Sequence, residues 1–154
     1  MSTTVEVERL VDARADALYG LVSDITRMGE WSPETSVCAW MDDATAPAVG
    51  VRFRGRNRNG ARRWSTVCTI TAADEGRRFA FDVDAGPMAV SHWEYRFEPE
   101  GGATRVTETW TDRRGRLITL LGTLLTGVGD RAEHNRATMA ATLERLAAAV
   151  EPSA

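Results

Sequence analysis

The chain has 154 residues, of which 43% are hydrophobic and 27% charged, and its formal net charge at pH 7 is −3. This length is typical of one domain with a substantial core, and the negative net charge excludes an overall basic field that would attract nucleic acid. All 19 basic residues are arginines, so no lysine side chain is available for Schiff-base chemistry.

Neither a signal peptide nor a membrane-spanning segment is predicted. The N-terminal stretch MSTTVEVERLVD carries charges where a signal peptide needs an apolar run. The longest nearly uncharged segment, Leu117 to Gly129, is shorter than the roughly 20 residues that cross a bilayer. Cys38 and Cys68 lie outside any CxxC motif, which fits reduced thiols better than a disulfide or metal framework. We therefore expect a cytoplasmic protein without stable membrane insertion.

The first part of the chain predicts a strand followed by two short helices. Thr3 to Val11 alternates between apolar and charged residues, which is typical of a half-buried strand. Asp12 is expected to cap a short helix over Arg14 to Val22. Asp24 is expected to begin a second short turn that ends at Gly29.

The middle of the chain predicts about six further strands. Apolar alternation, interrupted by turns rich in glycine, proline, asparagine and aspartate, marks each of them. They are Val37–Met41, Val51–Arg58, Arg62–Thr71, Arg78–Val83, Val90–Phe97 and Thr104–Thr111. Connections of hairpin length, such as Asn59-Gly60, predict that successive strands are antiparallel neighbours.

The segment from Arg131 to Val150 predicts a long helix, because good helix formers fill it without proline or glycine. Asp130 is the expected N-cap, and Pro152 prevents continuation. The helix carries an apolar stripe, with residues three or four positions apart: Met139, Leu143, Leu146 and Val150. This stripe needs an apolar surface to cover, so we expect an α+β fold in which the helix lies against the sheet.

The apolar parity of the strands defines one inward face. It collects Phe53, Asn57, Trp64, Thr66, Cys68, Phe79, Phe81, Trp93, Tyr95, Phe97, Val106, Glu108 and Trp110. A face so rich in aromatic side chains is consistent either with a packed core or with a lined pocket.

Two polar members of this face leave alternatives open. Glu108 is expected either to pair with an arginine or lie in water at an edge, or to be a cavity acid or base. Asn57 is expected either to satisfy backbone groups at the end of a hairpin or to hydrogen-bond a ligand.

The remaining polar residues predict no catalytic or metal constellation. His92 is expected to face solvent, and His134 lies off the apolar stripe of the last helix, which disfavours a metal site. Ser32 and Ser91 lack the G-x-S-x-G context of a serine hydrolase. The basic group Arg52, Arg54, Arg56, Arg58, Arg62 and Arg63 is expected to be a solvated outer face, with an anionic partner as the alternative.

The order of these elements, together with four segments, resembles the START-related helix-grip superfamily (SRPBCC), and more narrowly its polyketide cyclase/dehydrase and lipid-transport family. The segments are DARADALYGLVSDITRMGEWSPE, GVRFRGRNRNGARRW, WEYRFEPEGGATRVTETW and ATMAATLERL. The resemblance implies one helix-grip ligand-binding domain over residues 1–154. Its curved seven-stranded antiparallel sheet would wrap around the long C-terminal helix, with two short helices after the first strand and an apolar cavity inside.

The resemblance also implies where two segments lie. Trp31-Ser32-Pro33 would form a bend beside the cavity, and Leu117 to Gly129 would form a lid before the long helix. The alternative for the second segment is a short core helix. The family has no invariant catalytic motif, so no catalytic residue is carried over.

The sequence therefore predicts a protein that binds a small hydrophobic molecule, lipid-like or aromatic polyketide-like, without a cofactor. The alternative is a polyketide cyclase or dehydratase that acts by proton transfer, with Glu108 as candidate catalytic residue; the missing catalytic constellation favours binding. Monomer and homodimer both remain open. The predicted ligand-binding residues are Trp31, Phe53, Asn57, Trp64, Thr66, Phe81, Trp93, Tyr95, Glu108, Trp110, Leu121 and Met139.

Overall fold

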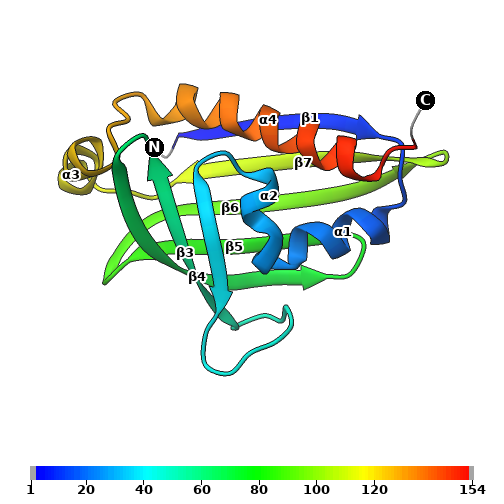
Figure 1. Ribbon diagram of the computed structural model, residues 1–154, viewed down its shortest axis with the longest axis horizontal. Helices are drawn as coiled ribbons and strands as arrows, with labels where there is room; N and C mark the ends of the chain where they lie inside the picture. The colour runs from blue at the N-terminus through cyan, green and yellow to red at the C-terminus, as the bar shows by residue number, and fades with distance from the viewer. Residues whose placement is uncertain (1–2, 153–154) are drawn as a thin grey trace.

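A curved antiparallel sheet of seven strands forms the body of the structure, a computed structural model that describes residues 3–152 (Figure 1). The strands are β1 (Thr4–Val11), β2 (Thr35–Trp40), β3 (Arg52–Asn59), β4 (Arg62–Asp74), β5 (Arg78–Ala85), β6 (Met88–Glu100) and β7 (Ala103–Asp112). Their order across the sheet is β1-β7-β6-β5-β4-β3-β2. All neighbours are antiparallel, as the short connections predict.

Four α-helices accompany the sheet: α1 (Ala15–Ser23), α2 (Met28–Trp31), α3 (Arg116–Thr126) and α4 (Arg131–Val150). A 3₁₀ turn, η1 (Ile25–Arg27), joins α1 to α2. In Figure 1, α4 runs along β1, α1 lies over β5 and β6, and α3 stands at the far end of the molecule. The predicted helix-grip architecture is confirmed. Within residues 3–152 no helix has both the length and the apolar character needed to cross a membrane.

The long helix begins and ends where the sequence predicts. The Asp130 carboxylate accepts a hydrogen bond from the backbone N–H of Glu133 at 3.1 Å, which satisfies one of the free amides of the first turn. Met139, Leu143 and Leu146 are almost fully buried, so the apolar stripe does cover the sheet.

Two local predictions near the N-terminus are wrong. Asp12 does not cap α1, because the backbone stays extended through Arg14 and the helix begins at Ala15. Gly29 does not end its turn but lies inside α2. A Cβ atom at Gly29 would lie 2.6 Å from the carbonyl oxygen of Ser36, so glycine is required there for the close approach of β2.

The larger packed core occupies one end of the space between sheet and helices, and a smaller cluster packs Val5 and Trp110 against Met139. Tyr19 of α1 makes edge contacts with Phe79 and Phe97, at ring-centroid distances of 6.4 and 6.1 Å. Val106, Leu143 and other buried apolar side chains complete this end. The inward face of the sheet is therefore a packed core beside α1, and the opposite end, beside α3, is hollow.

Candidate functional site

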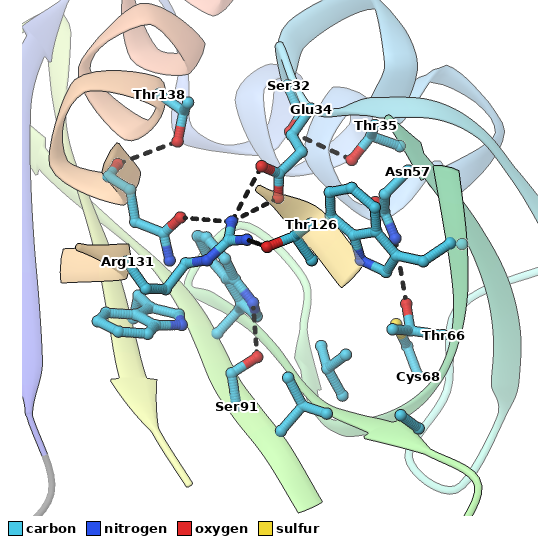
Figure 2. Close-up of a pocket in the computed structure, with 18 of the residues that line it drawn as sticks. Ser32, Glu34, Thr35, Asn57, Thr66, Cys68, Ser91, Thr126, Arg131 and Thr138 are labelled. Atoms are coloured by element: carbon cyan, nitrogen blue, oxygen red, sulfur yellow. Dashed lines mark hydrogen bonds and ion pairs between the residues drawn. The ribbon is translucent and has the colours of Figure 1, made fainter. Parts of the chain in front are cut away.

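A cavity of about 350 Å³ lies between the sheet, α3 and the first half of α4 (Figure 2). Trp64, Trp93 and Trp110 give it aromatic walls, on strands β4, β6 and β7. The structure places all of the predicted ligand-binding residues along this cavity except Trp31. The inward face was expected to be either a packed core or a lined pocket. It is a packed core at one end of the sheet and lines a pocket at the other.

Trp31 lies in the packed core instead of the cavity wall. It is the last residue of α2 and is buried, with the Arg27 guanidinium 5.0 Å from its ring. The next residue, Ser32, reaches the cavity. The predicted bend beside the cavity is thus present, but the tryptophan side chain turns away from the hollow.

Glu108 is a buried carboxyl group in the cavity wall. Its direct cross-strand neighbour is Tyr95, whose hydroxyl donates a hydrogen bond to Glu108 Oε1 at 2.7 Å. Within the described residues, Glu108 Oε2 has no hydrogen-bond partner, and no ion pair with an arginine is present. The expected alternatives of a salt bridge or an edge position in water are therefore both wrong.

Burial raises the pKa of Glu108 to about 8, because the surroundings disfavour the charged form, while the Tyr95 hydrogen bond lowers it in part. Burial also raises the pKa of Tyr95 well above 10, so its hydroxyl remains a donor. At neutral pH the carboxyl group is mostly protonated. Since Oε2 has no protein partner, the proton is available to a ligand acceptor in the cavity.

Asn57 also faces the cavity. Its side-chain amide donates to Thr66 Oγ1 at 3.4 Å, across the β3–β4 pair. The neighbouring Asn59 binds backbone at the hairpin end, where its amide donates to the carbonyl oxygen of Thr126 at 2.8 Å. Among the described residues, the Asn57 side chain makes no hydrogen bond to backbone groups, so the first of its two alternatives is wrong, and a hydrogen bond to a ligand stays a prediction.

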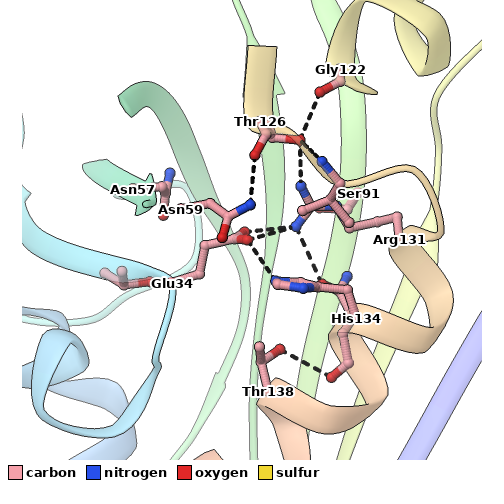
Figure 3. A network of polar contacts seen from close by, with 12 residues as sticks. Glu34, Asn57, Asn59, Ser91, Gly122, Thr126, Arg131, His134 and Thr138 are labelled. Atoms are coloured by element: carbon pink, nitrogen blue, oxygen red, sulfur yellow. Dashed lines mark hydrogen bonds and ion pairs between the residues drawn. The ribbon is translucent and has the colours of Figure 1, made fainter. Parts of the chain in front are cut away.

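A polar network closes one end of the cavity (Figure 3). Arg131 Nη1 donates to Glu34 Oε1 and Oε2 at 2.7 and 2.9 Å, and Nη2 donates to Thr126 Oγ1 at 2.8 Å. His134 Nε2 lies 2.9 Å from Glu34 Oε2. The Arg131 guanidinium also lies 6.0 Å from the Trp64 ring centroid. The network thus joins α4 to the end of α3 and to the segment before β2.

Arg131 is a cavity residue that was not among the predicted ligand-binding residues, although the sequence holds a signal for it. Arg131, Asn135, Thr138 and Thr142 recur at spacings of four, three and four, and all four line the cavity. They form a polar stripe on the first half of α4, beside the apolar stripe of Met139, Leu143, Leu146 and Val150. Glu34 offers no comparable signal, because it lies in a non-repeating segment 97 residues from Arg131.

Breaking this network is expected to destabilise the protein. The Glu34 and Arg131 side chains are only 19% and 12% exposed, so Arg131→Met leaves a largely desolvated carboxylate without its main partner. We expect the free energy of unfolding to fall by about 2 kcal/mol, measured by urea denaturation. The matched control is Asp16→Asn, which breaks the exposed Arg14–Asp16 pair and should cause no measurable loss. Equal effects of the two substitutions would contradict a structural role for the network.

The remaining candidate groups are a histidine on the outer face and two buried cysteines. His92 is on the outer face, 27% exposed, with Nδ1 2.7 Å from Asp82 Oδ1. Among residues 3–152, no three His, Cys, Asp or Glu side chains are grouped so as to hold a metal ion. Cys38 and Cys68 are free thiols that line the cavity, and burial raises the pKa of Cys38 to about 12. These thiols are therefore unionised and weakly nucleophilic.

Comparisons with known proteins agree with this architecture. A family model described as polyketide cyclase / dehydrase and lipid transport matches residues 2–151. A polyketide cyclase-like protein of Corynebacterium glutamicum, solved by NMR, is 31% identical over 98% of this chain and 90% of its own, with a TM-score of 0.60. No curated protein sequence matches the chain significantly.

Two more distant structures share the fold alone. The di-domain ARO/CYC protein StfQ from the steffimycin biosynthetic pathway is 14% identical, with a TM-score of 0.74 over 96% of this chain and 50% of its own. Major latex-like protein 151 from Panax ginseng is 13% identical, with a TM-score of 0.72 over 98% of this chain and 99% of its own. The family match over nearly the whole chain shows that this protein belongs to the polyketide cyclase/dehydrase and lipid-transport family.

Proposed function

We propose that the protein binds a small, mainly hydrophobic molecule in the cavity beside α3. The observation that carries this proposal is the hollow itself: three tryptophans line it, and a few polar groups point into it. Apolar pockets of this kind, with a small number of polar groups that fix orientation, are the usual form of a small-molecule site. A cytoplasmic location belongs to the same proposal, because Cys38 and Cys68 are free thiols.

The polar groups restrict the ligand further. A protonated Glu108 donates a hydrogen bond, so the ligand should place a carbonyl, ether or hydroxyl oxygen beside it. Asn57 offers a second polar contact on β3. Both arginines in the wall are already paired, Arg131 with Glu34 and Arg114 with Asp112, which leaves little attraction for a free ligand carboxylate. An uncharged, oxygenated aromatic molecule of the polyketide class therefore fits better than a fatty acid.

A second candidate function, dehydration or cyclisation of such a molecule, is supported by Glu108 alone. A carboxyl group with a pKa near neutrality can both give and accept a proton at physiological pH. In a dehydration, Glu108 would protonate a leaving hydroxyl, which departs as water. The resulting carboxylate would then take a proton from the adjacent carbon as the double bond forms.

Binding is tested by titration with oxygenated aromatic compounds and fatty acids. The emission of Trp64, Trp93 and Trp110 should change, because the ligand replaces water beside their rings. At a ligand concentration of about 100 Kd, the melting temperature should rise by roughly 5–10 °C. Unchanged emission and melting across both compound classes would contradict the proposal. Mass spectrometry of the released ligand separates the two functions, since a binder returns it unaltered and an enzyme returns product.

A further inference from the structure

The outer face of α3 is an unpartnered surface of leucines. Leu117, Leu120 and Leu124 are 65%, 62% and 69% exposed, and Leu121 and Leu125 are half exposed at the cavity rim. In Figure 1, α3 stands at the end of the molecule, clear of the packed core. Contiguous exposed apolar side chains of this kind mark an interaction site, since soluble proteins rarely leave such patches uncovered. We call these five side chains the leucine face.

Arginines without an ion-pair partner lie on the β3–β4 hairpin, which reaches the leucine face through Arg62. Arg58 and Arg63 lie directly opposite each other on β3 and β4, an arrangement that costs free energy unless an anion relieves it. Arg62 follows at the hairpin tip and donates to the carbonyl oxygen of Leu124 at 3.4 Å, which joins the hairpin to α3. Within residues 3–152, none of these three arginines forms an ion pair, and Arg116 at the start of α3 forms none either.

We propose that the leucine face and the arginines of the β3–β4 hairpin together dock on the surface of an anionic lipid bilayer. A helix that combines exposed leucines with flanking basic residues is the usual form of an interfacial membrane contact. With 11 residues, α3 is too short to span the bilayer and would lie in the interface plane.

The distribution of charge around the leucine face favours an anionic bilayer over a second copy of the chain as its partner. The segment from Arg113 to Gly129 contains no acidic residue, and neither does the hairpin from Arg52 to Arg63. A symmetric dimer through the leucine face would bring like charges together without a compensating carboxylate. An anionic headgroup layer supplies that compensation for the arginines of both segments.

Docking would also bring the cavity to the membrane. Leu121 and Leu125 lie on both the leucine face and the cavity lining, and Gly122 and Thr126 line the cavity from the inner side of α3. A ligand could then pass between bilayer and cavity with little exposure to water. This consequence rests on the proposed ligand-binding function, whereas docking itself does not.

Vesicle flotation tests the docking directly. The wild-type protein should bind vesicles of equimolar phosphatidylglycerol and phosphatidylcholine, and bind vesicles of phosphatidylcholine alone much more weakly. The double variant Leu120→Ser/Leu124→Ser should lose roughly tenfold or more in affinity. Its control is Leu10→Ser on β1, an exposed leucine far from α3, which should bind like the wild type. Arg58→Gln/Arg63→Gln should lose roughly fivefold per arginine, with Arg136→Gln on α4 as the control.

Three results would overturn the proposal. They are absence of binding to the anionic vesicles, equal binding to both vesicle types, and leucine variants that bind like the wild type. A dimer in sedimentation equilibrium that disappears in Leu120→Ser/Leu124→Ser would assign the leucine face to a second copy instead. All substitutions lie at exposed positions, and unchanged melting temperatures confirm that the variants are folded. Failure of ligand binding in solution with intact vesicle binding would overturn the proposed function and leave docking in place.

Discussion

Replacement of Glu108 by glutamine is expected to stabilise the protein at neutral pH. In the folded state, burial raises the pKa of Glu108 from an ordinary value of 4.5 to about 8. At pH 7 the wild type therefore loses about 3 kcal/mol of stability relative to acidic pH, at about 1.4 kcal/mol per pH unit. Glutamine is neutral at every pH and has nearly the same shape, so Glu108→Gln avoids this loss.

The direction in which stability changes with pH follows from the two pKa values of Glu108, folded and unfolded. Between pH 4.5 and about 8 the folded protein binds more protons than the unfolded chain, so the stability of the wild type falls as pH rises through this range. Urea denaturation should show wild type and Glu108→Gln converging below pH 4.5 and separating up to pH 8. Glu144→Gln, an exposed carboxylate on α4, should follow the wild type throughout. Parallel curves for wild type and Glu108→Gln would show that Glu108 is solvated.

Replacement of Gly55 by leucine is expected to abolish most ligand binding without unfolding the protein. Gly55 lies on β3 in the cavity wall, between Cys38 and Thr66. A leucine side chain there extends into the hollow and takes space that a ligand needs. We expect affinity to fall by about ten- to a hundredfold, which corresponds to the usual cost of overpacking a site. The melting temperature of the free protein should be unchanged or higher, because the leucine covers exposed apolar wall.

Gly55→Ala is the matched control for this substitution. Its Cβ would lie 3.5 Å from Thr66 Oγ1 and 3.7 Å from Cys38 Sγ, both ordinary contacts, so affinity should stay near that of the wild type. Fluorescence titration of the three proteins with the same ligand provides the measurement. Equal affinity for Gly55→Leu and the wild type would place the ligand outside the cavity.

The sequence predicts the elements of this fold because their signals are local. The period of the residues from Arg131 to Val150 and the alternation along the strands each arise within one element. The inward position of Glu108 is also predicted from local sequence, because the alternation along its strand is enough to place it on the inner face. Its protonation is not local, because burial by other elements raises its pKa against the opposing Tyr95 hydrogen bond, and no ion pair with an arginine forms within the described residues.

The remainder of the site depends on distances between elements. Whether the aromatic face is packed or hollow follows from the position of α1, which fills one end of the sheet and leaves a cavity lined by Trp64, Trp93 and Trp110 at the other. The Glu34–Arg131 pair spans 97 residues and joins two elements that have no shared pattern. The exposure of the leucines on α3 is a further case, because the same apolar segment would also suit a core helix; the structure shows that the core-helix alternative is wrong.

The cavity beside α3 is expected to hold a small hydrophobic molecule, and native mass spectrometry of wild type and Gly55→Leu tests this expectation most directly. Both proteins are exposed to a lipid-soluble extract of the source organism, repurified and compared. The wild type should carry a noncovalent adduct above its chain mass of 16.9 kDa, released on collisional activation, and Gly55→Leu should carry little or none. Bare chain mass for both proteins, or the same adduct on both, would contradict the claim.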